Sequence, residues 1–147
     1  MSLRFDYKTT DPASAKALRG LTEYSHGSGI EARLIHLIDV RASQINGCAF
    51  CIDMHTREAK ADGETEQRLY ALNAWRETPF FEERERAVLA LTEYVTRIAE
   101  KGVPDDIYQA LLPFFSPQQI LQIIVAIIAI NSWNRIAIST GMQPKAA

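Results

Sequence analysis

The stretch Val40-Arg41-Ala42-Ser43-Gln44-Ile45-Asn46-Gly47-Cys48-Ala49-Phe50-Cys51-Ile52-Asp53-Met54-His55 contains the only two cysteines of the 147-residue chain. Apolar residues at three- and four-residue spacings predict a helix from about residue 30 that Asn46-Gly47 ends. We expect a second helix to start at or near Cys48 and to run to about Ala61, where Asp62-Gly63 stops it. The pattern Cys-x-x-Cys-x-x-x-His thus lies where one helix gives way to the next.

The rest of the chain has helical periodicity too, and no segment shows convincing strand-type alternation. Asp11-Pro12 and Ser116-Pro117-Gln118-Gln119 are helix start signals, each with a capping side chain followed by proline. The pattern predicts a single all-α domain over residues 1–147, with about six to seven helices. Besides the two central helices, we expect helices that start near residues 12, 65, 81, 104 and 117, and a loop over His26–Gly29.

The segment from Ile120 to Ile130 is apolar on nearly every face, with Gln122 as the one interruption. A helix of this kind is buried on all sides. Either the domain's own core or another subunit could cover it, and the sequence leaves both alternatives open. The polar residues nearby, among them Asn131 and Asn134, would need hydrogen-bond partners if they are buried.

Composition narrows the class of protein. The chain is 47% hydrophobic and 23% charged, with a formal net charge of -2, so we expect neither disorder nor a nucleic-acid partner. The longest apolar run, residues 123–130, is shorter than a membrane span, and no secretory signal is recognisable. Two cysteines without a leader favour a reducing compartment, so the expected location is the cytoplasm.

On a helix, Cys48, Cys51 and His55 share one stripe, because each residue turns by about 100°. Cysteines at positions i and i+3 are close enough to form a disulfide, and a helix N-terminus stabilises a thiolate. Both thiols are therefore expected to titrate below the free-cysteine value of about 8.5. His55 lies one turn from Cys51 and is expected to accept its proton, whereas helix position by itself would favour Cys48 as the thiolate.

Two other interpretations of the cysteines remain open. A structural zinc ion needs four ligands, and His36 would have to complete a set with Cys48, Cys51 and His55. The cysteines could instead be inert core residues. A redox-active dithiol is the favoured interpretation, because a Cys-x-x-Cys pair within a helix differs from the loops that usually supply zinc ligands.

The run from Val40 to His55 resembles the alkylhydroperoxidase D-like (AhpD-like) core of the carboxymuconolactone decarboxylase superfamily. The similarity continues through Gly63, Leu69-Tyr70-Ala71-Leu72, Trp75, Phe81 and Glu85-Arg86-Ala87. The resemblance implies a helical antioxidant-type fold that assembles as homotrimers or homohexamers. It also implies reduction of hydroperoxides by a Cys-x-x-Cys pair that cycles through a disulfide, with Cys51 attacking the peroxide and Cys48 resolving.

The chain departs from the peroxidase pattern at two positions. The pattern has a relay glutamate twelve residues before the first cysteine, where this chain has His36, and a histidine where this chain has Phe50. A histidine at position 36 can still carry protons near neutral pH, so we expect a relay formed by His55 and His36. Asp39, one turn further on, is expected to face solvent, and His26 is expected to be solvated without a role.

Together these residues predict a thiol-dependent peroxidase with four catalytic residues, Cys51, Cys48, His55 and His36. Its substrate would be a hydroperoxide, and an external thiol or dithiol would reduce the disulfide again. No metal or organic cofactor is needed for this chemistry. The alternatives are a general disulfide reductase or a redox sensor that reports oxidation without catalysis.

Overall fold

Residues 2–146 are described by a computed structural model, which contains nine α-helices, one 3-10 helix and no strand over that range. The all-α prediction is confirmed. The helices outnumber the predicted six to seven because a short helix, α1 (Tyr7–Thr10), precedes the first expected one. In addition, the long helix expected to end at Lys101 breaks at Arg97 into α6 (Glu83–Thr96) and α7 (Ile98–Lys101).

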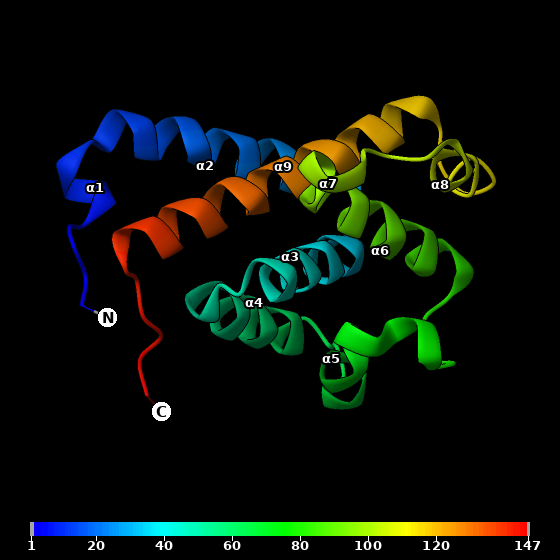
Figure 1. The fold of residues 1–147 in the computed structure, drawn as a ribbon, viewed down its shortest axis with the longest axis horizontal. Helices are drawn as coiled ribbons and strands as arrows, with labels where there is room; N and C mark the ends of the chain where they lie inside the picture. Colours follow the sequence, from blue (N-terminus) through cyan, green and yellow to red (C-terminus); the bar gives the residue numbers. More distant parts are fainter. Residues whose placement is uncertain (1, 147) are drawn as a thin grey trace.

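The helices α3 (Ala32–Asn46) and α9 (Pro117–Thr140) pack on each other at the centre of the fold. On one side α2 (Pro12–Gly27) lies along α9, and on the other α4 (Ala49–Ala61) pairs with α3 (Figure 1). The larger core is built mainly from aliphatic side chains of α3, α6 and α9, among them Leu34, Ile38, Val88, Ile123 and Ile127. The α3–α4 pair therefore sits directly against the central helix α9.

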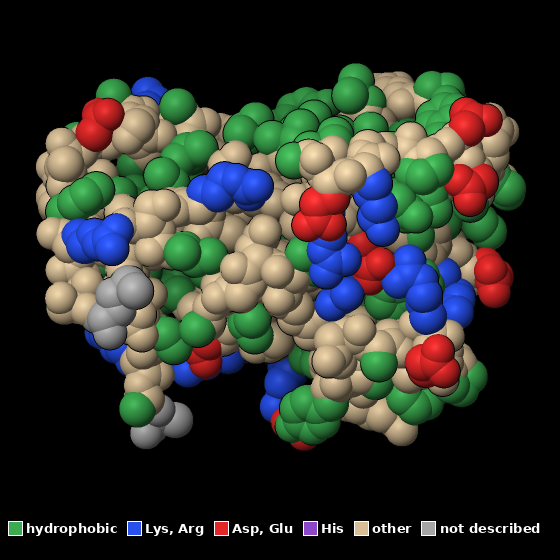
Figure 2. Space-filling model, viewed as in Figure 1, with side chains coloured by type: hydrophobic (Ala, Val, Ile, Leu, Met, Phe, Trp, Pro, Cys, Tyr) green, Lys and Arg blue, Asp and Glu red, His purple; other side chains and the backbone are tan. Residues whose placement is uncertain are grey.

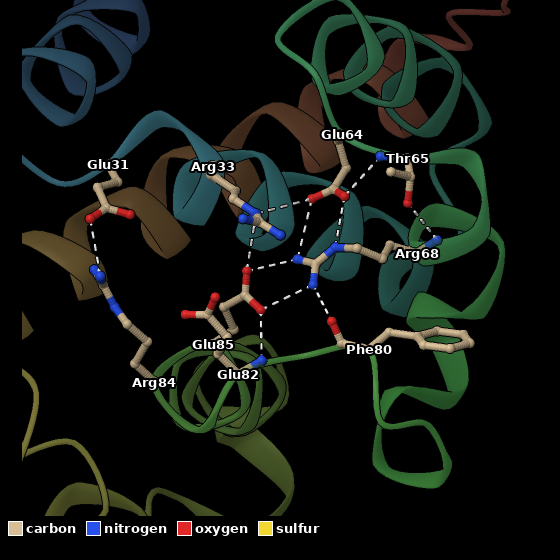
Figure 3. A network of polar contacts seen from close by, with 9 residues as sticks. All are labelled: Glu31, Arg33, Glu64, Thr65, Arg68, Phe80, Glu82, Arg84 and Glu85. Atoms are coloured by element: carbon tan, nitrogen blue, oxygen red, sulfur yellow. Dashed lines mark hydrogen bonds and ion pairs between the residues drawn. The ribbon is translucent and has the colours of Figure 1, made fainter.

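The connection from α4 to α6 contains α5 (Glu66–Ala71), the 3-10 helix η1 (Leu72–Glu77) and a buried ion-pair network. Arg68 pairs with Glu64 and Glu85 at 2.7 Å each, and Arg33 reaches the same two carboxylates from α3 (Figure 3). Glu85 also accepts the backbone N–H of Glu82 at the start of α6. The network links α3, the segment that carries Glu64 and Arg68, and the start of α6.

The short helix α8 (Asp105–Gln109) leads into α9, which begins with the predicted capping box. Ser116 and Gln119 exchange side-chain and backbone hydrogen bonds, and Gly141 ends the helix with a positive φ of 78°. By length and composition, α9 could span a membrane. However, half of the residues in its most apolar stretch are buried inside the fold. We therefore interpret α9 as the core helix.

Part of α9 remains uncovered. Leu121 and Ile128 are 59% and 44% exposed, and Figure 2 shows hydrophobic side chains gathered along the upper edge of the molecule, over the first half of this helix. An exposed apolar face of this kind is consistent with contact to another subunit. Assembly into trimers or hexamers stays a prediction.

Candidate active site

The turn between α3 and α4 places the first cysteine. Gly47 has a left-handed φ of 69°, and the backbone N–H of Cys48 donates to the carbonyl of Ser43 at 3.0 Å, which closes the end of α3. Cys48 is extended (φ -85°, ψ 92°) and is the N-cap of α4, with its sulfur accepting the backbone N–H of Cys51 at 3.4 Å. The predicted start of a helix near Cys48 is confirmed, and the cysteine occupies a position usually held by serine or aspartate.

Both cysteines are free thiols and are buried, with 1% and 2% of their surfaces exposed for Cys48 and Cys51. They pack with Ala137 of α9, and Phe50 and Met142 lie against the same cluster. The dithiol is therefore shielded from bulk solvent by apolar side chains.

The pKa values of the two thiols shift in opposite directions. The S–H of Cys51 donates to the sulfur of Cys48 and, with the Cys51 backbone N–H, lowers the pKa of Cys48 to about 7 against the opposing effect of burial. The same hydrogen bond, burial and the negative charge of Cys48 raise the pKa of Cys51. The prediction of a low pKa is therefore wrong for Cys51. Only Cys48 has the N-cap position that brings a backbone N–H to its sulfur.

Asn134 of α9 completes the surroundings of the dithiol and was not predicted as a site residue. It is fully buried, accepts a hydrogen bond from Asn46 at 2.8 Å and donates to the hydroxyl of Ser43 at 3.0 Å. Its amide also interacts with both sulfurs and lowers the pKa of each thiol. A polar residue on an otherwise apolar helix was the only signal in the sequence that could have indicated it.

His55 lies on α4 one turn beyond Cys51, and its Nδ1 faces two carboxylates. Nδ1 is 2.9 Å from Glu58 Oε2 and 3.6 Å from Asp39 Oδ2, and burial lowers the pKa of the imidazole. Asp39 is only 8% exposed, so the prediction that it faces solvent is wrong. It points across the α3–α4 interface because those helices pack closely at this level. Within residues 2–146 no hydrogen bond joins His55 to Cys51, and its role as proton acceptor stays a prediction.

His36 is buried on α3 and has a different partner. Its Nε2 lies 2.7 Å from Oδ2 of Asp62, whose side chain is 59% exposed, while its Nδ1 is buried without a hydrogen bond. No hydrogen bond links His36 to His55 in the described part of the chain, so the relay through His36 also stays a prediction. His26 lies in the last turn of α2, where a loop had been expected, and it lines a small cavity together with His55.

The alternative of a structural zinc site finds no set of ligands in this arrangement. Within the described residues, no group of three or more His, Cys, Asp or Glu side chains is placed to hold a metal ion. His36, which would have completed the set, turns toward Asp62 instead.

The fold and the dithiol define the class of this protein. The chain belongs to the carboxymuconolactone decarboxylase family, whose model matches residues 12–94. It is 43% identical over 141 residues to the uncharacterized protein YdfG of Bacillus subtilis (strain 168), with 96% of each chain covered.

Solved structures extend this likeness. A crystal structure of an Agrobacterium tumefaciens protein of unknown function, assigned only provisionally as the antioxidant defence protein AhpD, is 46% identical with a TM-score of 0.96. The match covers 99% of this chain and 100% of that one. A cysteine-to-alanine variant of the debrominase Bmp8, in complex with 2,3,4-tribromopyrrole, is 20% identical, with a TM-score of 0.84 over 94% of this chain and 74% of the other. That second likeness shows a shared fold.

Proposed function

We propose that this protein is a thiol-dependent peroxidase that reduces hydroperoxides through a cycle between the Cys48–Cys51 dithiol and its disulfide. The observation that carries the proposal is the pair of buried free thiols at the start of α4, where the sulfur of Cys48 accepts the backbone N–H of Cys51 at 3.4 Å. It provides a thiolate near neutral pH and a partner thiol within reach for disulfide formation. The resemblance to AhpD-type proteins supports a peroxide as substrate.

In the proposed mechanism, the proton of Cys51 first passes to Cys48 across their hydrogen bond. The Cys51 thiolate then attacks the terminal oxygen of the hydroperoxide, the O–O bond breaks, and the departing oxygen takes a proton to become an alcohol. The Cys48 thiol condenses with the Cys51 sulfenic acid, which forms the disulfide and releases water. An external thiol or dithiol supplies the two electrons that restore the dithiol.

Cys51 is assigned the attacking role because it is the sulfur nearer to the acid–base groups. The neighbouring imidazole of His55 lies close to Glu58 and Asp39, and Cys48 is one helical turn further from that imidazole than Cys51. His55 is on the same helix one turn away. Protons can therefore be exchanged on the Cys51 side of the pair, while the sulfur of Cys48 accepts the backbone N–H of Cys51.

Steady-state turnover with dithiothreitol tests the proposal. Wild-type protein should consume many equivalents of cumene hydroperoxide, and Cys51→Ser should abolish repeated turnover. Cys48→Ser cannot form the internal disulfide, so it should turn over only as fast as dithiothreitol reduces the Cys51 sulfenic acid directly. Dimedone, which traps sulfenic acids, should label Cys51 in the Cys48→Ser variant. Labelling of Cys48 in the Cys51→Ser variant alone would reverse the two roles, and full turnover in both variants would contradict the mechanism.

Reduction of protein disulfides is the second candidate function, since the low pKa of an N-cap cysteine also suits disulfide exchange. The burial of both sulfurs favours the peroxide instead. A protein disulfide must bring its sulfur into line with an exposed thiolate, whereas a small hydroperoxide requires far less access. Insulin reduction measured beside peroxide turnover separates the two functions.

A further inference from the structure

Asn134 is a buried polar residue on α9 that the proposed thiol cycle does not yet use. It is fully buried, and most of the other buried residues of that helix are apolar. A buried amide is costly unless its carbonyl oxygen and both of its N–H bonds find partners. Two hydrogen bonds satisfy the carbonyl oxygen and one N–H, which leaves the second N–H for another partner.

Both of these hydrogen bonds run to the end of α3, next to Cys48. The carbonyl oxygen of Asn134 accepts an N–H of Asn46 at 2.8 Å, and its NH2 group donates to the hydroxyl of Ser43 at 3.0 Å. The backbone carbonyl of Ser43 in turn accepts the backbone N–H of Cys48 at 3.0 Å. Asn134 is therefore tied to the turn that places the first cysteine.

Arg135 fixes the direction of the hydrogen bonds in this group of amides. A guanidinium can only donate, and Nη1 of Arg135 lies 2.9 Å from Oδ1 of Asn131. The same oxygen accepts an N–H from Nδ2 of Asn46 at 3.0 Å, so Asn46 presents its NH2 group to α9. Asn134 must then present its carbonyl oxygen to Asn46, and its NH2 group lies on the other side. The orientation of the Asn134 amide therefore follows from the network.

The two sulfurs are the groups left for the second N–H of Asn134. Within residues 2–146, the bond to Ser43 is the one hydrogen bond to nitrogen or oxygen that its Nδ2 donates. Ala137, one turn further along α9, packs against Cys48 and Cys51, so the same side of the helix meets the dithiol. A donor without another partner therefore lies beside the group that becomes negatively charged.

Asn134 differs from the other neighbours of the dithiol, because it acts on both sulfurs in the same direction. Phe50 and Met142 lie against the sulfurs, and neither side chain has a polar N–H or O–H. The backbone N–H of Cys51 lies 3.4 Å from the sulfur of Cys48 and favours a thiolate there alone. The mutual hydrogen bond of the cysteines has the largest effect on their pKa values, lowering that of Cys48 and raising that of Cys51. Asn134 has a smaller effect on the two pKa values but lowers both.

We propose that the second N–H of Asn134 is a shared hydrogen-bond donor of the dithiol, which stabilises a negative charge on Cys48 and on Cys51 alike. The inference rests on the proposed peroxidase function, in which the proton of Cys51 passes to Cys48 before the Cys51 thiolate attacks. The negative charge thereby moves from Cys48 to Cys51. A donor that binds only Cys48 opposes this transfer, whereas a donor that serves both sulfurs does not. Asn134 exchanges no proton itself and forms no bond with the peroxide.

Variants with a single cysteine test the proposal, because each thiol then titrates alone. In Cys48→Ala and in Cys51→Ala, the ultraviolet absorbance of the thiolate gives the pKa of the remaining thiol. Adding Asn134→Leu, which keeps the size of the side chain, should lower the ionisation constant of the thiol about tenfold in both backgrounds.

Asn131→Leu is the matched control for Asn134→Leu. Asn131 is a buried amide of the same network, hydrogen-bonded to Asn46 and Thr96, and it is not among the groups that shift the pKa of either thiol. Its replacement should leave the ionisation constants of both thiols within about twofold. An equal change in Asn131→Leu would show that the network only supports the shape of the site. That result, a change in one background alone, or unchanged constants in Asn134→Leu would each overturn the inference.

Nuclear magnetic resonance of the reduced, isotope-labelled wild type is a second test that depends on no variant. One side-chain N–H proton of Asn134 should move downfield as the dithiol ionises, while the other, which binds Ser43, should move much less. Side-chain protons that do not respond to the ionisation would contradict a shared donor. None of these measurements involves peroxide, so the two proposals fail separately. A protein that shows the expected shifts but reduces no cumene hydroperoxide would contradict the peroxidase function and confirm the shared donor.

Discussion

Replacing Cys51 by alanine removes the S–H group that donates to the sulfur of Cys48, and the structure gives the size of the expected effect. The pKa of Cys48 is about 7, compared with about 8.5 for a free cysteine. This difference of about 1.5 units corresponds to about 2 kcal/mol of stabilisation of the thiolate. The hydrogen bond from Cys51 is the largest contribution, so most of the difference should vanish in Cys51→Ala.

The change should be large at neutral pH. A thiol with a pKa of 7 is about half ionised at pH 7, whereas one with a pKa of 8.5 is about 3% ionised. The thiolate fraction should therefore fall about fifteenfold in Cys51→Ala. Because both sulfurs are buried, the ultraviolet absorbance of the thiolate is a better assay than alkylation, which depends on access.

Cys51→Ser is the matched control, since its hydroxyl can still donate to the Cys48 sulfur and its backbone N–H is retained. The pKa of Cys48 should stay near 7 in this variant and rise in Cys51→Ala. Equal pKa values in the two variants would refute a shared proton. A pKa near 7 for Cys51 in the Cys48→Ala variant would show that the proton is assigned to the wrong sulfur.

Three further predictions concern stability. Arg68→Met leaves the carboxylates of Glu64 and Glu85 buried and should lower the free energy of unfolding, measured in urea, by about 3–5 kcal/mol. Ser116→Ala removes the cap of α9 and should cost about 1 kcal/mol in the same assay. The raised pKa of Asp39 means that the folded state keeps a proton that the unfolded state loses near pH 4. The free energy of unfolding of the wild type should therefore fall as the pH rises from there toward the folded pKa, whereas that of Asp39→Asn should not show this fall.

Each prediction has an outcome that would contradict it. Arg84 forms a surface ion pair with Glu31, and Arg84→Met should lower the free energy of unfolding by less than about 1 kcal/mol. If Arg68→Met lowered it by no more than Arg84→Met, the buried network would contribute little to stability. An unchanged unfolding midpoint in Ser116→Ala would exclude a stabilising cap. A stability difference between wild type and Asp39→Asn that does not vary with pH would contradict a raised pKa.

Local signals in the sequence predicted much of the fold correctly. Gly47 ends a helix and Ser116-Pro117 starts one because these residues act within a single turn of the chain. The break at Arg97 was missed because residues on both sides of it continue the helical spacing.

The site was only partly predictable, because its finer features depend on contacts between distant segments. Asp39 was expected at the surface, but its burial depends on how α3 packs against α4. Asn134 comes from a helix more than 80 residues beyond the cysteines, and no local pattern connects them. Glu93 of α6 likewise pairs with Arg41 of α3 and Arg76 of η1, which no local pattern connects to it.

The most direct test of the redox dithiol is the stoichiometry of a single oxidation. Reduced protein is mixed with one equivalent of cumene hydroperoxide without added reductant, and free thiols, disulfide and cumyl alcohol are counted after denaturation. We predict that both thiols disappear, that one Cys48–Cys51 disulfide forms, and that one cumyl alcohol appears per chain. Two remaining thiols with intact hydroperoxide would contradict the central claim.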